Sequence, residues 1–156
     1  NVQQTKSGSL YIVGKRHSNL SATEFAALHG QLGDQIEPVN LPEMIKIVDF
    51  MLNLKDIAKS ASYIQEGGML ITATKMALRA EKGLQFNIEK FCTEELFSEF
   101  LGFVVEIENE SEFTKIAQEK NIHIEKIATI KGTKILGEQI SNLKNIWKNG
   151  LRKLTN

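Results

Sequence analysis

The chain has 156 residues, a length at which one hydrophobic core is expected, so we predict a single domain. Lys and Arg together number 19, as do Asp and Glu, and this balance gives no reason to expect nucleic acid or an anionic membrane as a partner. No apolar run reaches the ~18 residues of a membrane-spanning helix. The single cysteine, Cys92, excludes an internal disulfide and is compatible with a reducing cytoplasm, and the three separated histidines offer no metal-ligand spacing.

The N-terminal part of the chain predicts one strand followed by one short helix. Residues 1–8 are polar, and we expect them to be a lead-in to a domain that spans residues 9–156. The apolar, β-favouring run at 9–14 predicts a buried strand. Ser21 and Glu24 form an S-x-x-E capping box, which predicts the start of a helix.

The next part predicts a helix, a strand, a tight turn and a second helix. Asn40 and Glu43 form another capping pattern with a proline in the first turn, and apolar residues then recur at helical spacing to about residue 60. Residues 60–65 are predicted to be a strand that enters the turn at Gly67 and Gly68. The residues after this pair are apolar nearly all round, which indicates a helix buried on more than one side.

Alternating apolar residues in the second half indicate strands whose two faces differ. Residues 84–88 and 102–108 alternate cleanly, and 122–130 is a strand in which a slip of the alternation suggests a bulge. Strands with distinct faces are untypical of a fully buried parallel sheet. We therefore predict an α+β fold with one mixed sheet covered by helices. Three helix starts and one optional strand complete the order: helices at Thr93, at Asn109 or Ser111, and after Ser141, with the strand near 133–138.

Gly67 and Gly68 allow two interpretations. A strand-turn-helix with glycines can present its N-terminal amides to an anion such as phosphate. The alternative is a turn that needs positive φ and binds nothing. Glu66, directly before the pair, would repel a phosphate and favours the second interpretation.

Other polar residues are weaker site candidates. Ser98 and Glu99 lie between apolar residues near the end of a predicted helix, which a solvated helix end explains equally well. The run Lys15-Arg16-His17 after the first strand could hold an anion or be an ordinary surface loop. The chain contains no nucleophile-elbow spacing, P-loop or G-x-G-x-x-G motif. From these residues alone we expect no catalytic group and no metal site in this domain.

Taken in order along the chain, a set of segments resembles one known domain. The segments are SGSLYIVGKRHSNLSATEF, EPVNL, SYIQEGGMLITATKMAL, LFSEFLGFVVEIE and LKNIWKNGLRKL. Together they resemble the C-terminal domain of the aminoimidazole ribonucleotide synthetase superfamily. Within that superfamily, the chain is most similar to phosphoribosylformylglycinamidine (FGAM) synthase of the PurL type. The resemblance implies a three-layer α/β/α fold.

The motifs that carry this resemblance depart from the family pattern. Ser21-Ala22-Thr23 replace a family G-G-S before the first helix. The family motif H-D-x-S-D-G-G-L appears at 62–69, where only the glycines are unchanged and Glu66 keeps the charge of the family Asp. In the family motif L-F-S-E-S-x-x-R, the serine and glutamate are present as Ser98 and Glu99.

Two further departures in this last motif replace polar groups by aromatic rings. Phe100 stands at the position of the second family serine, and Phe103 stands at that of the arginine. Both substitutions remove hydrogen-bonding capacity.

The resemblance implies a role in an ATP-dependent ligase of purine biosynthesis. FGAM synthase activates the formyl amide oxygen of formylglycinamide ribonucleotide with ATP and Mg²⁺, and ammonia derived from glutamine then displaces phosphate. The chain would be a C-terminal fragment of this cytoplasmic enzyme, inactive alone. Its implied partners are an N-terminal domain, which holds most of the ATP and metal contacts, and a glutaminase domain or subunit. The residues implied to lie near substrate or nucleotide phosphates are Ser21, Thr23, Glu66, Gly67, Gly68, Ser98 and Glu99.

Two other hypotheses stay open at this point. The lost polar groups favour a degenerate, non-catalytic module kept for assembly or regulation. A sister enzyme, such as selenophosphate synthetase or the hydrogenase-maturation dehydratase, is the other alternative, although the L-F-S-E element favours the FGAM synthase branch.

Overall fold

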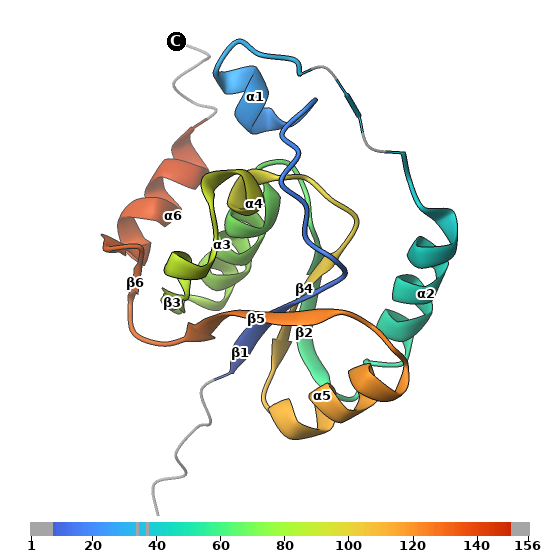
Figure 1. Cartoon of the computed structure of the whole chain (residues 1–156). Coiled ribbons are helices and arrows are strands. Elements are labelled where there is room, and N and C mark those ends of the chain that lie inside the picture. The colour runs from blue at the N-terminus through green and yellow to red at the C-terminus, as the bar shows by residue number, and fades with distance from the viewer. Residues whose placement is uncertain (1–7, 34, 37, 151–156) are drawn as a thin grey trace, which may run out of the picture.

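A seven-stranded mixed sheet forms the centre of the computed structural model, which describes residues 8–33, 35–36 and 38–150 (Figure 1). The strands lie in the order β2-β4-β1-β5-β3-β6-β7, and only the β3–β6 pair is parallel. Their bounds are β1 Ser9–Val13, β2 Ala58–Tyr63, β3 Leu84–Phe86, β4 Phe103–Ile107, β5 Ile124–Ile130, β6 Lys134–Ile135 and β7 Glu138–Gln139.

Each face of the sheet carries its own hydrophobic cluster. Successive side chains of a strand point to opposite faces. Leu10 and Ile12 of the central strand β1 therefore join one cluster, while Tyr11 and Val13 join the other. All five residues of β1 are buried, because helices cover the sheet on both sides.

Helices complete three layers around the sheet. One face is covered by α3 (Gly68–Ala80), α4 (Thr93–Phe97) and α6 (Ile140–Asn149), and the other by α2 (Leu41–Leu52) and α5 (Glu110–Glu119) (Figure 1). The short helix α1 (Glu24–Leu28) lies beyond the end of the sheet, and a 3₁₀ turn, η1 (Ile88–Lys90), follows β3. The predicted α+β class and the three-layer arrangement are confirmed. No helix among the described residues is long and apolar enough to cross a membrane.

Several local predictions are confirmed by specific contacts. The side chain of Asn40 caps α2 by accepting a hydrogen bond from the Glu43 N–H at 3.2 Å, and Asn109 caps α5 in the same way. Phe103, Val105 and Ile107 all belong to the same cluster, as their alternation predicts. The expected bulge of β5 is seen as a register shift against β1, and the optional strand is present as the small hairpin β6–β7.

Some helix boundaries were predicted wrongly. Thr23, not Ser21, caps α1. The helix expected to run to about residue 60 ends at Leu52; the side-chain amide of Asn53 donates to the Asp49 carbonyl at 2.7 Å, and the chain then turns toward β2. Cys92, not Thr93, occupies the cap position of α4, where its N–H donates to Glu95 at 3.1 Å.

The last helix differs from its prediction in burial. It starts at Ile140, and its expected apolar stripe is only partly covered, because Ile146 is 67% exposed. Leu151 and Leu154, assigned to the same stripe, lie outside the described residues, as does the polar lead-in except for Gly8.

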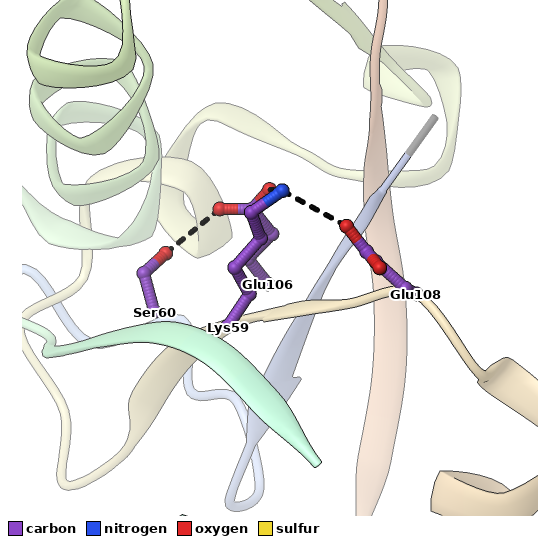
Figure 2. A network of polar contacts seen from close by, with 4 residues as sticks. All are labelled: Lys59, Ser60, Glu106 and Glu108. Carbon is purple, nitrogen blue, oxygen red and sulfur yellow. Dashed lines mark hydrogen bonds and ion pairs between the residues drawn. The ribbon is translucent and has the colours of Figure 1, made fainter. Parts of the chain in front are cut away.

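A polar network joins the edge strand β2 to β4. Figure 2 shows Ser60 and Lys59 of β2 directed toward two carboxylates, that of Glu106 in β4 and that of Glu108 just after it. The Ser60 hydroxyl donates to Glu106 at 2.9 Å, and the Lys59 ammonium lies 3.9 Å from Glu106 and 2.9 Å from Glu108. Glu106 is buried, so these contacts supply partners for a charge removed from water.

A second network attaches α5 to the sheet. The carboxylate of Glu110 accepts hydrogen bonds from Ser9 (2.7 Å) and Tyr11 (2.5 Å) of β1 and from Lys126 (2.8 Å) of β5. Partial burial acts to raise the pKa of Glu110, but the hydrogen bonds from Lys126, Tyr11 and Ser9 outweigh it and lower the pKa to about 2. Burial, together with the bond to Glu110, raises the pKa of Tyr11.

This network predicts how stability depends on pH. Because the folded-state pKa of Glu110 lies below the ordinary value, its contribution is present above about pH 4.3 and is lost as pH falls toward about 2. We expect Glu110→Gln to lower the free energy of unfolding at pH 7 by roughly 1 kcal/mol, since the partly exposed pair is screened. Urea unfolding of both proteins between about pH 2 and 7 measures this difference, which should shrink as the pH falls.

Glu119→Gln, at an exposed carboxylate of the same helix, is the control. A difference between wild type and Glu110→Gln that stays constant over the whole pH range would contradict the assignment.

Candidate functional site

The Gly67–Gly68 turn links β2 to α3 in a backbone conformation that favours glycine. Gly67 has φ of 87° and Gly68 has φ of 70°, both in the left-handed region. A Cβ on Gly68 would lie 2.6 Å from the carbonyl carbon of Phe97 and 2.7 Å from the carbonyl oxygen of Leu96. Gly68 is therefore needed both for its φ and for the close approach of the end of α4.

A buried threonine fixes the same turn. Thr72, in the second turn of α3, donates its hydroxyl to the Gly68 carbonyl at 2.9 Å and accepts the Gln65 N–H at 3.2 Å. The sequence reasoning missed this residue, because a threonine in an apolar helix carries no motif that points to the preceding turn.

The carboxylate of Glu99 lies where the anion interpretation places a phosphate. Its Oε1 atom accepts hydrogen bonds from the backbone N–H of Gly67 and of Glu24, each at 2.9 Å. These groups belong to the N-terminal ends of α3 and α1, which carry unpaired N–H donors and a partial positive charge. The protein's own carboxylate thus pairs with the amide that was a candidate for binding an external anion.

The hydroxyls of Ser98 and Thr23 bind the backbone around α1. Ser98, which is buried, donates to the Asn19 carbonyl at 2.8 Å. Thr23 donates to the Leu20 carbonyl at 2.7 Å and accepts the Ala26 N–H at 3.2 Å. Both side chains therefore fix the 19–33 loop, the segment that contains α1.

The segment Ser21-Ala22-Thr23, which replaces the family G-G-S, contains a backbone conformation that glycine usually adopts. Ala22 has φ of 59°, a left-handed conformation that costs an L-residue energy, and it stands at the second glycine of the family pattern. Its N–H donates to the Leu32 carbonyl at 2.8 Å, and Gly33 packs directly on Ser21. The 19–33 loop therefore closes on itself.

A pocket of about 190 Å³ lies between this loop and the segment after α4. Three of the predicted site residues, Ser21, Ser98 and Glu99, contribute to its lining. The remainder of the lining combines polar, charged and apolar residues: Lys15, His17, Asn19, Asn40, Glu43, Ile36, Pro38, Val39, Phe100 and Leu101.

The other predicted site residues lie beside this pocket or apart from it. Thr23, Gly67 and Gly68 do not line it, although the Gly67 N–H donates to Glu99, which does. Glu66 is exposed next to the turn.

The aromatic replacements became packing residues. Phe100 is buried in the cluster on the α3 side and stacks on His17, with ring centroids 5.9 Å apart. Phe103 is partly buried in the cluster on the opposite face. The family polar groups at these positions are thus replaced by apolar contacts.

Within the run Lys15-Arg16-His17, Arg16 is already engaged. Its guanidinium lies 2.5 Å from Glu95 and 3.0 Å from Glu125, and it stacks over the Phe91 ring at 5.1 Å. Lys15 and His17 line the pocket instead. Among the described residues, no group of three or more His, Cys, Asp or Glu side chains could hold a metal ion.

The close approach at Gly68 yields a stability prediction. Gly132 has nearly the same φ, 72°, but open space where a Cβ would lie, so it is a matched control. We expect Gly132→Ala to cost roughly 1–2 kcal/mol for the backbone conformation alone, and Gly68→Ala roughly 2–5 kcal/mol because the backbone of Leu96 and Phe97 must move. Chemical denaturation measures both, and equal losses would contradict the packing argument.

At Ala22, which has a left-handed backbone conformation, we predict a gain in stability instead of a loss. Ala22→Gly should raise the free energy of unfolding by roughly 1 kcal/mol, since glycine adopts this φ without strain. Ala27→Gly, in the exposed face of α1, should lower it by roughly 0.5–1 kcal/mol. Thermal or urea unfolding of the two variants decides the point, and a loss of stability for Ala22→Gly would show that the strain is absent.

At the level of sequence, nearly the whole chain is similar to known proteins. No protein-family model matches it. The phosphoribosylformylglycinamidine synthase subunit PurL of Carboxydothermus hydrogenoformans is 26% identical over 166 residues, covering 95% of this chain and 23% of the relative. The same subunit from Thermoplasma acidophilum is 23% identical, covering 92% of this chain and 21% of the relative. The chain thus spans less than a quarter of the length of these relatives.

Solved structures give the same result for the fold. Thermotoga maritima PurL complexed with FGAR superimposes with a TM-score of 0.66 at 13% identity, covering 89% of this chain and 28% of that one. The same protein complexed with ATP gives a TM-score of 0.60 at 15% identity, covering 88% and 25%. The predicted resemblance is therefore confirmed: nearly the whole chain is similar to one part of the PurL subunit of phosphoribosylformylglycinamidine synthase, and it has the fold found in PurL structures.

Proposed function

We propose that residues 9–156 are one domain of a cytoplasmic FGAM synthase and form one wall of its substrate and nucleotide cleft. The observation that carries this proposal is the incomplete pocket at Ser21, Ser98 and Glu99. Its volume of about 190 Å³ is below the roughly 300–1,000 Å³ of complete small-molecule sites. A second protein surface is needed to enclose a nucleotide or a ribonucleotide substrate there.

An uncovered apolar segment beside the pocket supports the need for that second surface. Large apolar side chains from the end of α1, through the connection, to the first turns of α2 are between 62% and 82% exposed: Leu28, Leu32, Ile36, Val39, Leu41 and Ile45. Ile36 and Val39 also line the pocket. Successive exposed apolar residues of this kind mark a surface that another protein surface covers. We assign that role to an ATP-binding domain of the same enzyme, because the relatives are more than four times as long as the aligned segment.

The residues present indicate which steps this domain supports and which belong to the ATP-binding domain. The described residues contain no group that could hold Mg²⁺, so metal and most ATP contacts are assigned to the other domain. Lys15 places one ammonium in the pocket lining, which also contains the carboxylates of Glu43 and Glu99, and we assign this ammonium to a phosphate of the substrate or nucleotide. In the proposed reaction, the formyl amide oxygen of formylglycinamide ribonucleotide is phosphorylated by ATP, and ammonia from a glutaminase domain or subunit then displaces the phosphate. This domain positions ligand and contributes no catalytic group.

The test uses the protein encoded by the complete reading frame. We expect it to form FGAM from formylglycinamide ribonucleotide, ATP, Mg²⁺ and ammonium, and the 156-residue chain alone to form none. The double variant Ile36→Asp, Val39→Asp should lower the rate at least tenfold by disrupting the apolar contact. Leu136→Asp, at an exposed apolar residue of the β6–β7 turn, is the control and should retain activity. A complete protein that forms no FGAM while a PurL standard does would contradict the proposal.

A non-catalytic assembly or regulatory module is the second candidate. It is favoured by the pairing of Gly67 with Glu99 and by the packing of Phe100 and Phe103, which leave fewer groups for a ligand. Its distinguishing result is a complete protein that is inactive yet co-purifies stoichiometrically with a glutaminase subunit.

A further inference from the structure

We propose that Glu99 is a positioning residue: its carboxylate is the resident anion of the Gly67–Gly68 turn and holds the 19–33 loop closed against α3 and α4. This assignment does not depend on which reaction the complete protein performs, since it concerns contacts within this chain.

The geometry makes one oxygen atom common to two distant segments. Oε1 of Glu99 accepts from Glu24, 75 residues away, and from Gly67, 32 residues away, at 2.9 Å in both cases. Hydrogen bonds to an ionised acceptor are about twice as strong as neutral ones. Because both N–H groups lie in the first turn of a helix or just before it, neither has a partner within its own helix.

The loop needs this attachment because α1 is short. A helix of five residues is far below the length at which isolated helices are stable, so contacts with the rest of the protein must hold it. Three contacts do so: Glu99 with the Glu24 N–H, Ser98 with the Asn19 carbonyl, and the stacked rings of Phe25 and Phe97 at 4.7 Å. The Glu99 contact is the charged one among them.

Sharing one acceptor couples the loop to the turn. When the Glu99 side chain moves away, Glu24 and Gly67 lose their acceptor together. The loop also supplies Asn19 and Ser21 to the wall of the pocket. The position of this wall therefore depends on the contact between Glu99 and the Glu24 N–H.

Amide hydrogen exchange by NMR on the full 156-residue chain tests the proposal without any ligand. In Glu99→Ala, the amides of Glu24 and Gly67 should both exchange at least about tenfold faster than in wild type, because each loses its acceptor. Glu99→Gln keeps an acceptor oxygen without the charge and should give a smaller increase at both amides. Glu89→Ala, at an exposed carboxylate outside the site, should change neither.

The amides of the central strand residues Val104 and Val105 report whether the fold is intact. If they also lose protection in Glu99→Ala, the comparison is made with Glu99→Gln. Unchanged exchange at Glu24 and Gly67, or an increase at only one of them, would overturn the proposal. Because no substrate is present, this result is independent of whether the complete protein makes FGAM.

Discussion

One carboxylate oxygen, Oε1 of Glu99, joins the ends of two helices, and the arrangement of the candidate site depends on it. The contact is possible because Gly68 has no side chain, so the backbone of Leu96 and Phe97 lies directly against the turn. Glu99 follows two residues later and therefore reaches the Gly67 N–H. A substitution at Gly68 would move the carboxylate as well as the helix, so the glycine pair and the glutamate act as one structural unit. The Gly67–Gly68 turn is therefore neither an open phosphate site nor a turn that binds nothing, because the carboxylate of Glu99 occupies the Gly67 N–H.

The sheet explains why this unit lies where a ligand could reach it. Two hydrophobic clusters, one on each face, hold the strands and five of the helices, while α1 and its loop lie beyond the end of the sheet (Figure 1). The turn, the end of α4 and the loop meet there around a small pocket with an uncovered apolar border. The sheet is thus enclosed on both faces, whereas this end of the domain leaves large apolar side chains exposed. That is the architecture expected of a segment whose relatives are more than four times longer.

Much of the fold could be predicted from the sequence because it depends on local patterns. The alternation at 103–107 and the caps at Asn40 and Asn109 each depend on residues within a few positions, and the structure confirms them. The largest error arose where a distant contact decides. The helix expected to reach about residue 60 stops at Leu52, because the chain must pair Ala58 with Ile107 of β4. The link from Glu99 to Glu24 spans 75 residues and follows no periodicity, so the resemblance singled out the glutamate as a candidate without revealing its partner.

A crystal structure of the complete protein with nucleotide and formylglycinamide ribonucleotide bound tests the central claim most directly. We expect Oε1 of Glu99 to stay on the Gly67 and Glu24 N–H groups, at distances near the present 2.9 Å, while ligand lies in the pocket and is enclosed by a second domain against Ile36 and Val39. A ligand phosphate bound directly to the Gly67 N–H, with Glu24 still held in place and Glu99 turned away to solvent, would contradict it.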